Sequence, residues 1–153
     1  MFTFLISAIK IIFLLGFLIL IHETGHFVVA KLCKVRVNEF AIGFGPTIWK
    51  KQGKETKYAL RLIPLGGFIS MEGEEELSDK EGSFSKASIP KRVAIVAAGA
   101  IVNIIFALIV YFILATSYNF QVTNNWGSAL TFAGEKTGTF ITSTFEGLKQ
   151  LFT

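Results

Sequence analysis

The fold is decided by residues 1–26, MFTFLISAIKIIFLLGFLILIHETGH. From Phe2 to Ile21 the side chains are nearly all apolar, and Lys10 carries the only charge. A helix of about 20 residues spans the hydrocarbon core of a bilayer, so this stretch is long enough to be a transmembrane helix. The following residues contain no proline and one glycine before Leu32, so we expect the helix to cover residues 1–33.

A cleaved signal peptide is the alternative interpretation of this N-terminal stretch. Such a peptide needs a basic region before the apolar run and small residues at a cleavage site. Met1 to Ile9 carries no charge, and the apolar run ends in His22 and Glu23. We therefore expect the first helix to be retained.

A second apolar stretch runs from Val93 to Ala115 without a charge, and Asn103 is its only strongly polar side chain. It predicts a second transmembrane helix over residues 91–117. The 153-residue chain is 52% hydrophobic and contains 16 phenylalanines, more than an ordinary globular domain. Both the apolar stretches and the composition therefore indicate a membrane protein.

The segment between the two apolar stretches is expected to have a sheet and a loop. Residues 34–72 contain β-prone runs separated by glycine and proline turns, which predicts a small antiparallel sheet of four short strands at the membrane surface. The runs are 35–44, 47–51, 56–63 and 67–71. Residues 73–90 begin with a cluster of acidic residues and are expected to form a solvated loop.

The C-terminal segment, 118–153, is less apolar. We expect a polar link from Tyr118 to Asn125 and then an amphipathic helix that lies in the membrane interface without crossing it. Its apolar side chains recur at helical spacing, at Ile141, Phe145, Leu148 and Phe152. The expected fold is thus an α-helical membrane protein with two transmembrane helices, a small antiparallel β-sheet between them and an amphipathic interfacial helix.

The distribution of positive charge predicts the topology. Twelve of the 15 Lys and Arg residues lie between Lys31 and Arg92. The positive-inside rule places segment 31–92 in the cytoplasm, and the N-terminus and all residues after Tyr118 on the outer side. The lysines lack the interleaved aromatic residues of a nucleic-acid surface, so no nucleic acid is expected as a partner.

The end of the first helix carries the residues that suggest chemistry. His22 and His26 are four residues apart, so both imidazoles project from one helix face and can hold a single Zn²⁺ ion. Glu23 lies beside them, where its carboxylate can act as the general base of amide hydrolysis. A chance meeting of these residues is the alternative, but ionisable groups at the end of an apolar span are costly and usually functional.

These residues, together with several others, resemble the site-2 proteases, and in particular the bacterial regulator-of-sigma-E type. The resemblance covers residues 1–117. Besides the His22–His26 motif, it rests on three short motifs: Gly43-Phe44-Gly45, Pro64-Leu65-Gly66-Gly67-Phe68, and Gly99 with Asn103, where Ala100 replaces the family's proline. It implies an intramembrane zinc metalloprotease of the inner (plasma) membrane that cleaves transmembrane substrates in the bilayer, as in regulated intramembrane proteolysis.

The resemblance also suggests roles for individual residues. A sheet with free backbone groups could pair with an extended substrate, which makes its turn residues substrate-binding candidates. They are Gly43, Phe44, Gly45, Pro64, Gly66 and Gly67; ordinary hairpin turns are the alternative. Asn103 could donate a hydrogen bond to the substrate carbonyl or the forming oxyanion, or could join two helices instead.

One expected zinc ligand is missing from the sequence. In the family the third ligand is an Asp in a later L-D-G motif, whereas Asp79 is the only Asp here and no L-D-G occurs. We expect a chain that is cut short; a catalytically silent membrane adaptor, binding partners through the sheet edge, is the alternative. The short link 118–125 leaves no room for the family's PDZ domain.

A rival within enzymes is the class of membrane zinc proteases that use a Glu as third ligand. That class predicts a soluble helical domain after the membrane spans. Here the zinc motif is followed by a glycine-rich sheet, which favours the site-2 type.

Overall fold

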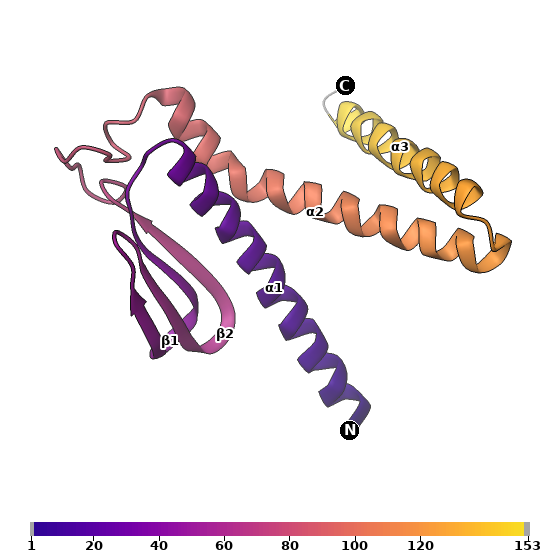
Figure 1. Cartoon of the computed structure of the whole chain (residues 1–153), viewed down its shortest axis with the longest axis horizontal. Coiled ribbons are helices and arrows are strands. Elements are labelled where there is room, and N and C mark those ends of the chain that lie inside the picture. Colours follow the sequence, from indigo (N-terminus) through magenta and orange to yellow (C-terminus); the bar gives the residue numbers. More distant parts are fainter. Residues whose placement is uncertain (1, 152–153) are drawn as a thin grey trace. The chain divides into compact units, whose positions relative to one another are not determined.

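The computed structural model describes residues 2–151 and contains three helices and two strands (Figure 1). In chain order they are α1 (Phe2–Leu32), β1 (Val37–Gln52), β2 (Lys57–Met71), α2 (Ile89–Thr123) and α3 (Trp126–Leu151). The strands pair antiparallel. The predicted class, an α-helical membrane protein with a small antiparallel sheet, is confirmed.

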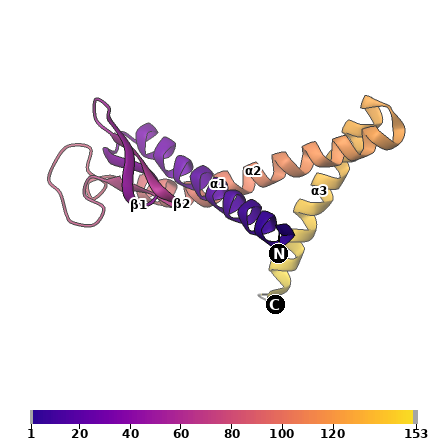
Figure 2. The same cartoon turned by 90° about the horizontal axis from the view of Figure 1, so that it is seen from below.

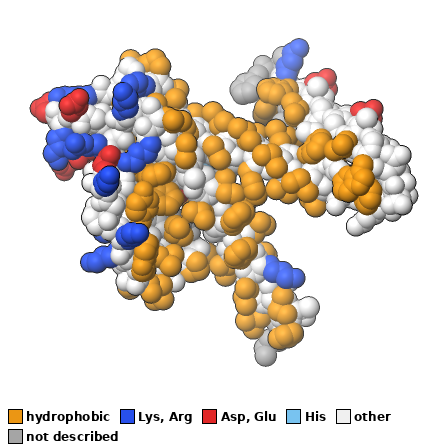
Figure 3. Space-filling model, in the orientation of Figure 1, with side chains coloured by type: hydrophobic (Ala, Val, Ile, Leu, Met, Phe, Trp, Pro, Cys, Tyr) orange, Lys and Arg blue, Asp and Glu red, His pale blue; other side chains and the backbone are white. Residues whose placement is uncertain are grey.

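Two of the described helices, α1 and α2, are long and apolar enough to cross a bilayer. The first half of α1 leaves its large apolar side chains open: Phe4 is 77% exposed and Phe13 is 74% exposed. Figure 3 shows these hydrophobic side chains along α1, whereas most charged side chains of residues 1–103 gather near the loop that follows β2. Such a surface is stable against lipid and unfavourable in water.

The sheet lies against α1 and is built from two long, bent strands (Figure 2). The sequence predicts four short strands, whereas the structure has two. The residues from Glu39 to Ile42 have partners in both halves of β2, at 57–60 and at 67–70. The glycine-containing turns at 43–46 and 64–67 therefore bend each strand back on itself without ending it.

A small apolar core joins these elements. Ala30, Val35, Val37, Met71 and Ile95 are its buried members, from α1, both strands and α2. The end of α1 is thereby fixed to the sheet and to the beginning of α2.

The loop after β2 is less solvated than the sequence predicts. Ser83 is buried, and Phe84 packs against the apolar core. Glu72 accepts hydrogen bonds from the Ser78 hydroxyl at 2.7 Å and from the Asn38 amide at 3.2 Å, and pairs with Lys80 at 3.1 Å. The Ser78 bond is the largest of the causes that lower the pKa of Glu72 to about 2. Of the acidic residues in the loop, Glu72 is partly buried, whereas residues 74–77 and 79–81 are exposed.

A second unit begins at Ile104, and its described part is a helical hairpin made by the end of α2 and α3. The rings of Tyr111 and Phe140 stack at 5.3 Å. The link predicted over 118–125 is helical as far as Thr123, and only Asn124 and Asn125 separate the helices. Asn125 ends the turn because its side-chain oxygen accepts hydrogen bonds from the first backbone N–H groups of α3. Phe152, predicted to extend the apolar face of this helix, lies outside the described residues.

Candidate metal centre

The two histidines of α1 converge on one point. His22 and His26 lie one helical turn apart, and their Nε2 atoms are 3.1 Å from each other. A tetrahedral zinc ion binds imidazole nitrogens at about 2.0–2.1 Å, which puts two such nitrogens about 3.3 Å apart. The separation therefore fits two ligands of one metal ion.

The backbone of α2 orients one of the two rings. His26 Nδ1 lies 2.7 Å from the carbonyl oxygen of Ile95. A carbonyl oxygen only accepts hydrogen bonds, so Nδ1 carries the proton and Nε2 keeps its lone pair. This is the tautomer that binds a metal through Nε2, and such outer partners usually fix metal-binding histidines.

Gly99 makes room for the point where the rings converge. A Cβ atom on this residue would lie 2.5 Å from His26 Nε2 and 2.6 Å from His22 Nε2, closer than real Cβ contacts. The helices also approach closely at Gly25, where a Cβ would lie 2.8 Å from the carbonyl oxygen of Ala98. The small residues on both helices thus let the two imidazoles occupy the place that a side chain at residue 99 would take.

Asn103 completes the α2 side of the site. Its Nδ2 lies 3.3 Å from His22 Nδ1. Ile95, Gly99 and Asn103 are spaced by four residues, so they form one face of α2 that meets the histidine face of α1. Sequence reasoning did not identify Ile95 or assign Gly99 to the metal site. The sequence does show that Ile95 and Gly99 lie eight and four residues before Asn103, a spacing that places all three on one helix face.

Glu23 lies between the histidines and the sheet. The backbone of Ile69 in β2 lies close enough to interact with its carboxylate. A Cβ atom on Gly67 would lie 3.4 Å from the Cγ atom of Glu23, so this part of β2 passes directly beside the carboxylate. The predicted general base and one predicted substrate-binding glycine are brought together.

The other predicted substrate-binding residues form two bends that meet. Gly66 has a φ of +108° and lies against the ring of Phe44, which only a residue without a side chain allows. The carbonyl oxygen of Pro64 approaches Gly16 of α1, where a Cβ would be 2.5 Å away. Gly43 and Gly45 lie in the first bend, where their nearest neighbours belong to Arg61 and Ile63 of β2.

Comparison with known proteins assigns the chain to a family. Residues 10–153 match the model of peptidase family M50. The chain belongs to peptidase family M50.

Curated relatives of this M50 chain carry protease names. A "Putative zinc metalloprotease" of Clostridium acetobutylicum is 49% identical over 102 residues, which are 67% of this chain and 30% of the relative. A protein of the same description from Fusobacterium nucleatum is 41% identical over 113 residues, 74% of this chain and 32% of the relative.

The regulator of sigma-E protease RseP of Escherichia coli is 42% identical over 121 residues, 74% of this chain and 26% of the relative. The chain thus spans about a third of the length of these relatives, or less. The resemblance to the site-2 proteases is confirmed at the level of the family.

The described part of the M50 chain contains two candidate metal ligands, His22 and His26. No group of three His, Cys, Asp or Glu side chains that could hold a metal occurs in residues 2–151. Asp79 lies in the loop after β2, where it pairs with Lys86 at 3.3 Å. The spacing of the two imidazoles fits a zinc ion. A catalytic zinc site generally has three protein ligands, so a further ligand is needed.

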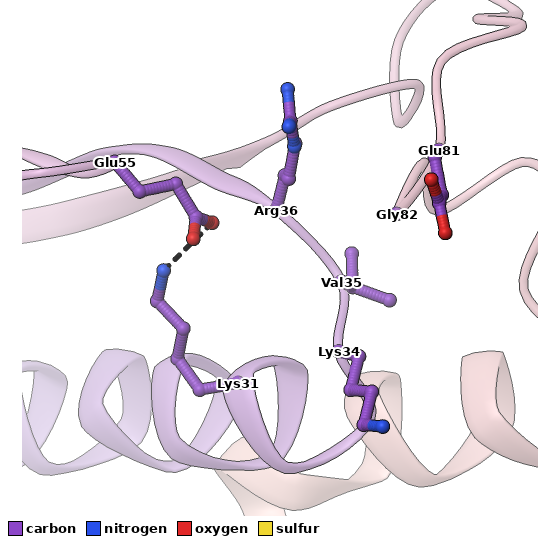
Figure 4. A pocket seen from close by; sticks show the side chains of 7 residues that line it. All are labelled: Lys31, Lys34, Val35, Arg36, Glu55, Glu81 and Gly82. Carbon is purple, nitrogen blue, oxygen red and sulfur yellow. Dashed lines mark hydrogen bonds and ion pairs between the residues drawn. The ribbon is translucent and has the colours of Figure 1, made fainter.

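A separate cavity of about 400 Å³ lies at the end of α1 of the M50 chain (Figure 4). Lys31 donates to Glu55 at 2.8 Å, and the same carboxylate oxygen accepts from the backbone N–H of Val37 at 3.2 Å. The hydrogen bond from Lys31 lowers the pKa of Glu55. No histidine lines this cavity. Glu55 connects the end of α1 to the turn between β1 and β2 and to the first residue of β1.

Proposed function

We propose that this chain belongs to an intramembrane zinc metalloprotease that hydrolyses peptide bonds of transmembrane proteins. One observation carries the proposal: two imidazole Nε2 atoms converge in front of Gly99, beside Glu23, in a helix long and apolar enough to span a bilayer. Membership of peptidase family M50 supports the same activity.

His22 and His26 are the proposed zinc ligands of the chain. Zinc, when bound, supplies Lewis-acid polarisation of the scissile carbonyl and lowers the pKa of water to about 7. Glu23 is the proposed general base. Its carboxylate takes a proton from the attacking water and passes it to the leaving nitrogen as the amide bond breaks.

The sheet is the proposed substrate-binding element. An amide bond inside a transmembrane helix is shielded, so a substrate must become extended before it is cut. The passage of Gly67 and Ile69 beside Glu23 supports pairing of an extended substrate along this part of β2. The bends that contain Gly43, Phe44, Gly45, Pro64 and Gly66 would shape that surface. Asn103 of α2, which lies beside His22, is proposed to act at the same active site.

The proposed location is the inner (plasma) membrane, with lipid around α1 and α2. The excess of Lys and Arg in segment 31–92 supports a cytoplasmic position for the sheet and its loop. The metal centre would then lie near the cytoplasmic end of the first span.

Replacing Glu23 by Gln tests the proposed mechanism. The substitution keeps the size of the side chain and removes the proton acceptor, so we expect full zinc content and loss of cleavage by about 10²-fold or more. Zinc content and cleavage of a transmembrane substrate would be measured on the full-length protein in detergent. Glu75→Gln, in the exposed part of the loop, is the matched control and should cleave normally.

Two results would contradict the proposal. Undiminished cleavage by Glu23→Gln would remove Glu23 from the mechanism. Less than about one tenth of a zinc ion per wild-type chain would favour the membrane adaptor instead.

A further inference from the structure

The amide of Asn103 uses only part of its hydrogen-bonding capacity. Its Nδ2 lies 3.3 Å from His22 Nδ1. Its Oδ1 is buried and has no hydrogen-bond partner within residues 2–151. Buried polar atoms without a partner are rare in folded proteins, so this oxygen calls for an explanation.

The two nitrogens of His22 supply that explanation. A neutral imidazole carries one N–H, and binding of a metal through Nε2 requires that the proton sit on Nδ1. Nδ1 is then a donor and needs an acceptor. The amide nitrogen of Asn103 cannot accept, but a half-turn of the planar amide exchanges Nδ2 with Oδ1. In that orientation Oδ1 accepts from His22 Nδ1, and the unpaired oxygen has its partner.

The same arrangement already exists for the other histidine. The carbonyl oxygen of Ile95 lies 2.7 Å from His26 Nδ1. Ile95 and Asn103 lie on one face of α2, on either side of Gly99. An acceptor on α2 would thus stand behind each imidazole, while both Nε2 atoms lie against Gly99.

We propose that Asn103 is a positioning residue that holds His22 in its metal-binding tautomer and orientation. The proposal rests on the metal site of the proposed function and gives Asn103 a role that acts through His22. It differs from direct contact with the substrate carbonyl or oxyanion, because a positioning residue changes metal affinity in the absence of substrate.

Zinc affinity of the full-length protein in detergent separates the two roles. It would be measured by competition with a chromophoric chelator. Loss of an outer hydrogen-bond partner typically lowers metal affinity by about 10–100-fold, and we expect a loss of this size for Asn103→Ala. Asn103→Asp should bind zinc at least as tightly as the wild type, because a carboxylate is a stronger acceptor for the Nδ1 proton.

Val102→Ala is the matched control. Val102 is the neighbour of Asn103 on α2, and its Cγ2 lies beside Gly25 of α1. The variant removes packing between the two helices and no hydrogen bond. Its zinc affinity should stay within about twofold of the wild-type value, well inside the range of a lost outer partner.

The outcomes decide between the roles. Wild-type affinity in Asn103→Ala, or equal weakening in Asn103→Ala and Asn103→Asp, would overturn the positioning role. If Asn103→Ala does not fold, Asn103→Asp carries the test, and an affinity about tenfold below wild type overturns the proposal. His26→Ala is measured in parallel: if it binds zinc like the wild type, the proposed metal site fails, whichever result Asn103 gives.

Discussion

At residue 99, a single methyl group would block the proposed metal site. The Nε2 atoms of His22 and His26 both lie within 2.6 Å of the position that a Cβ on Gly99 would take. Glycine normally weakens a helix by about 1 kcal/mol relative to alanine, so its presence in α2 costs stability. In return, Gly99 allows both imidazoles to pack against α2.

We therefore expect Gly99→Ala to lose most of its zinc binding. The added methyl group would displace the two imidazoles, while the helix propensity of α2 would rise. Zinc content after dialysis and the helical circular dichroism signal would be measured together. Gly134→Ala is the control, because a Cβ atom on Gly134 would have no neighbouring atom within 4 Å. Normal zinc content in Gly99→Ala would show that the imidazoles bind metal elsewhere than in front of residue 99.

The sequence was sufficient to identify the candidate metal ligands and the candidate general base. The spacing of His22, Glu23 and His26 predicts a shared helix face, and the structure places both imidazoles there. The role of Ile95 could not be predicted, because every residue has a carbonyl oxygen and only the packing of α2 on α1 selects this one. The same packing brings the side-chain amide of Asn103 next to His22.

At the scale of the elements, the sheet is held by an ion cluster as well as by its backbone. Glu39 of β1 pairs with Lys57 at 2.9 Å and with Arg61 at 3.0 Å, both from β2. Burial raises the pKa of Glu39, but the hydrogen bonds from Lys57 and Arg61 outweigh it, so the pKa lies below its ordinary value of 4.5. The ionised form of Glu39 is thus favoured in the folded sheet.

This cluster predicts an acid-dependent loss of stability. A lowered pKa contributes stability that is present above the unfolded value and is lost as the pH falls through the folded value. Glu39→Gln should lower the free energy of unfolding by about 1–2 kcal/mol at pH 7, and the difference should shrink below pH 4.5. Thermal unfolding in detergent between pH 7 and pH 3 measures both. Glu75→Gln should follow the wild type, and a difference that stays constant down to pH 3 would contradict the role of the ionised carboxylate.

The secondary structure was predictable where one pattern dominates a long stretch. Both apolar helices were expected from length and hydropathy, and both are present. The sheet was harder to predict. Glycine and proline indicate a change of chain direction, but they do not determine whether the hydrogen bonds between the strands continue. The link before α3 was misjudged since the residues from Tyr118 to Thr123, although partly polar, continue the backbone bonds of α2.

At the scale of the whole molecule, the charge distribution predicts the membrane topology, with segment 31–92 in the cytoplasm. Labelling of single cysteines can test it. Cys33 is the only cysteine, so a Cys33→Ser background allows single reporter cysteines. A cysteine at Lys54 should react with a membrane-impermeant maleimide only when the cytoplasmic face is accessible. A cysteine at Asn124 should react only from the outer side. Labelling of both from one side would refute the proposed topology.

The acceptor for His26 belongs to the main chain, and this has a consequence for mutational scanning. Exchanging the side chain of Ile95 leaves its carbonyl oxygen in place, so a scan of single substitutions would record position 95 by its packing alone. Asn103, by contrast, would be recorded directly. The two acceptors would therefore be scored for different reasons. Only a change to the backbone, such as an ester linkage between residues 95 and 96, would test the carbonyl oxygen of Ile95 itself.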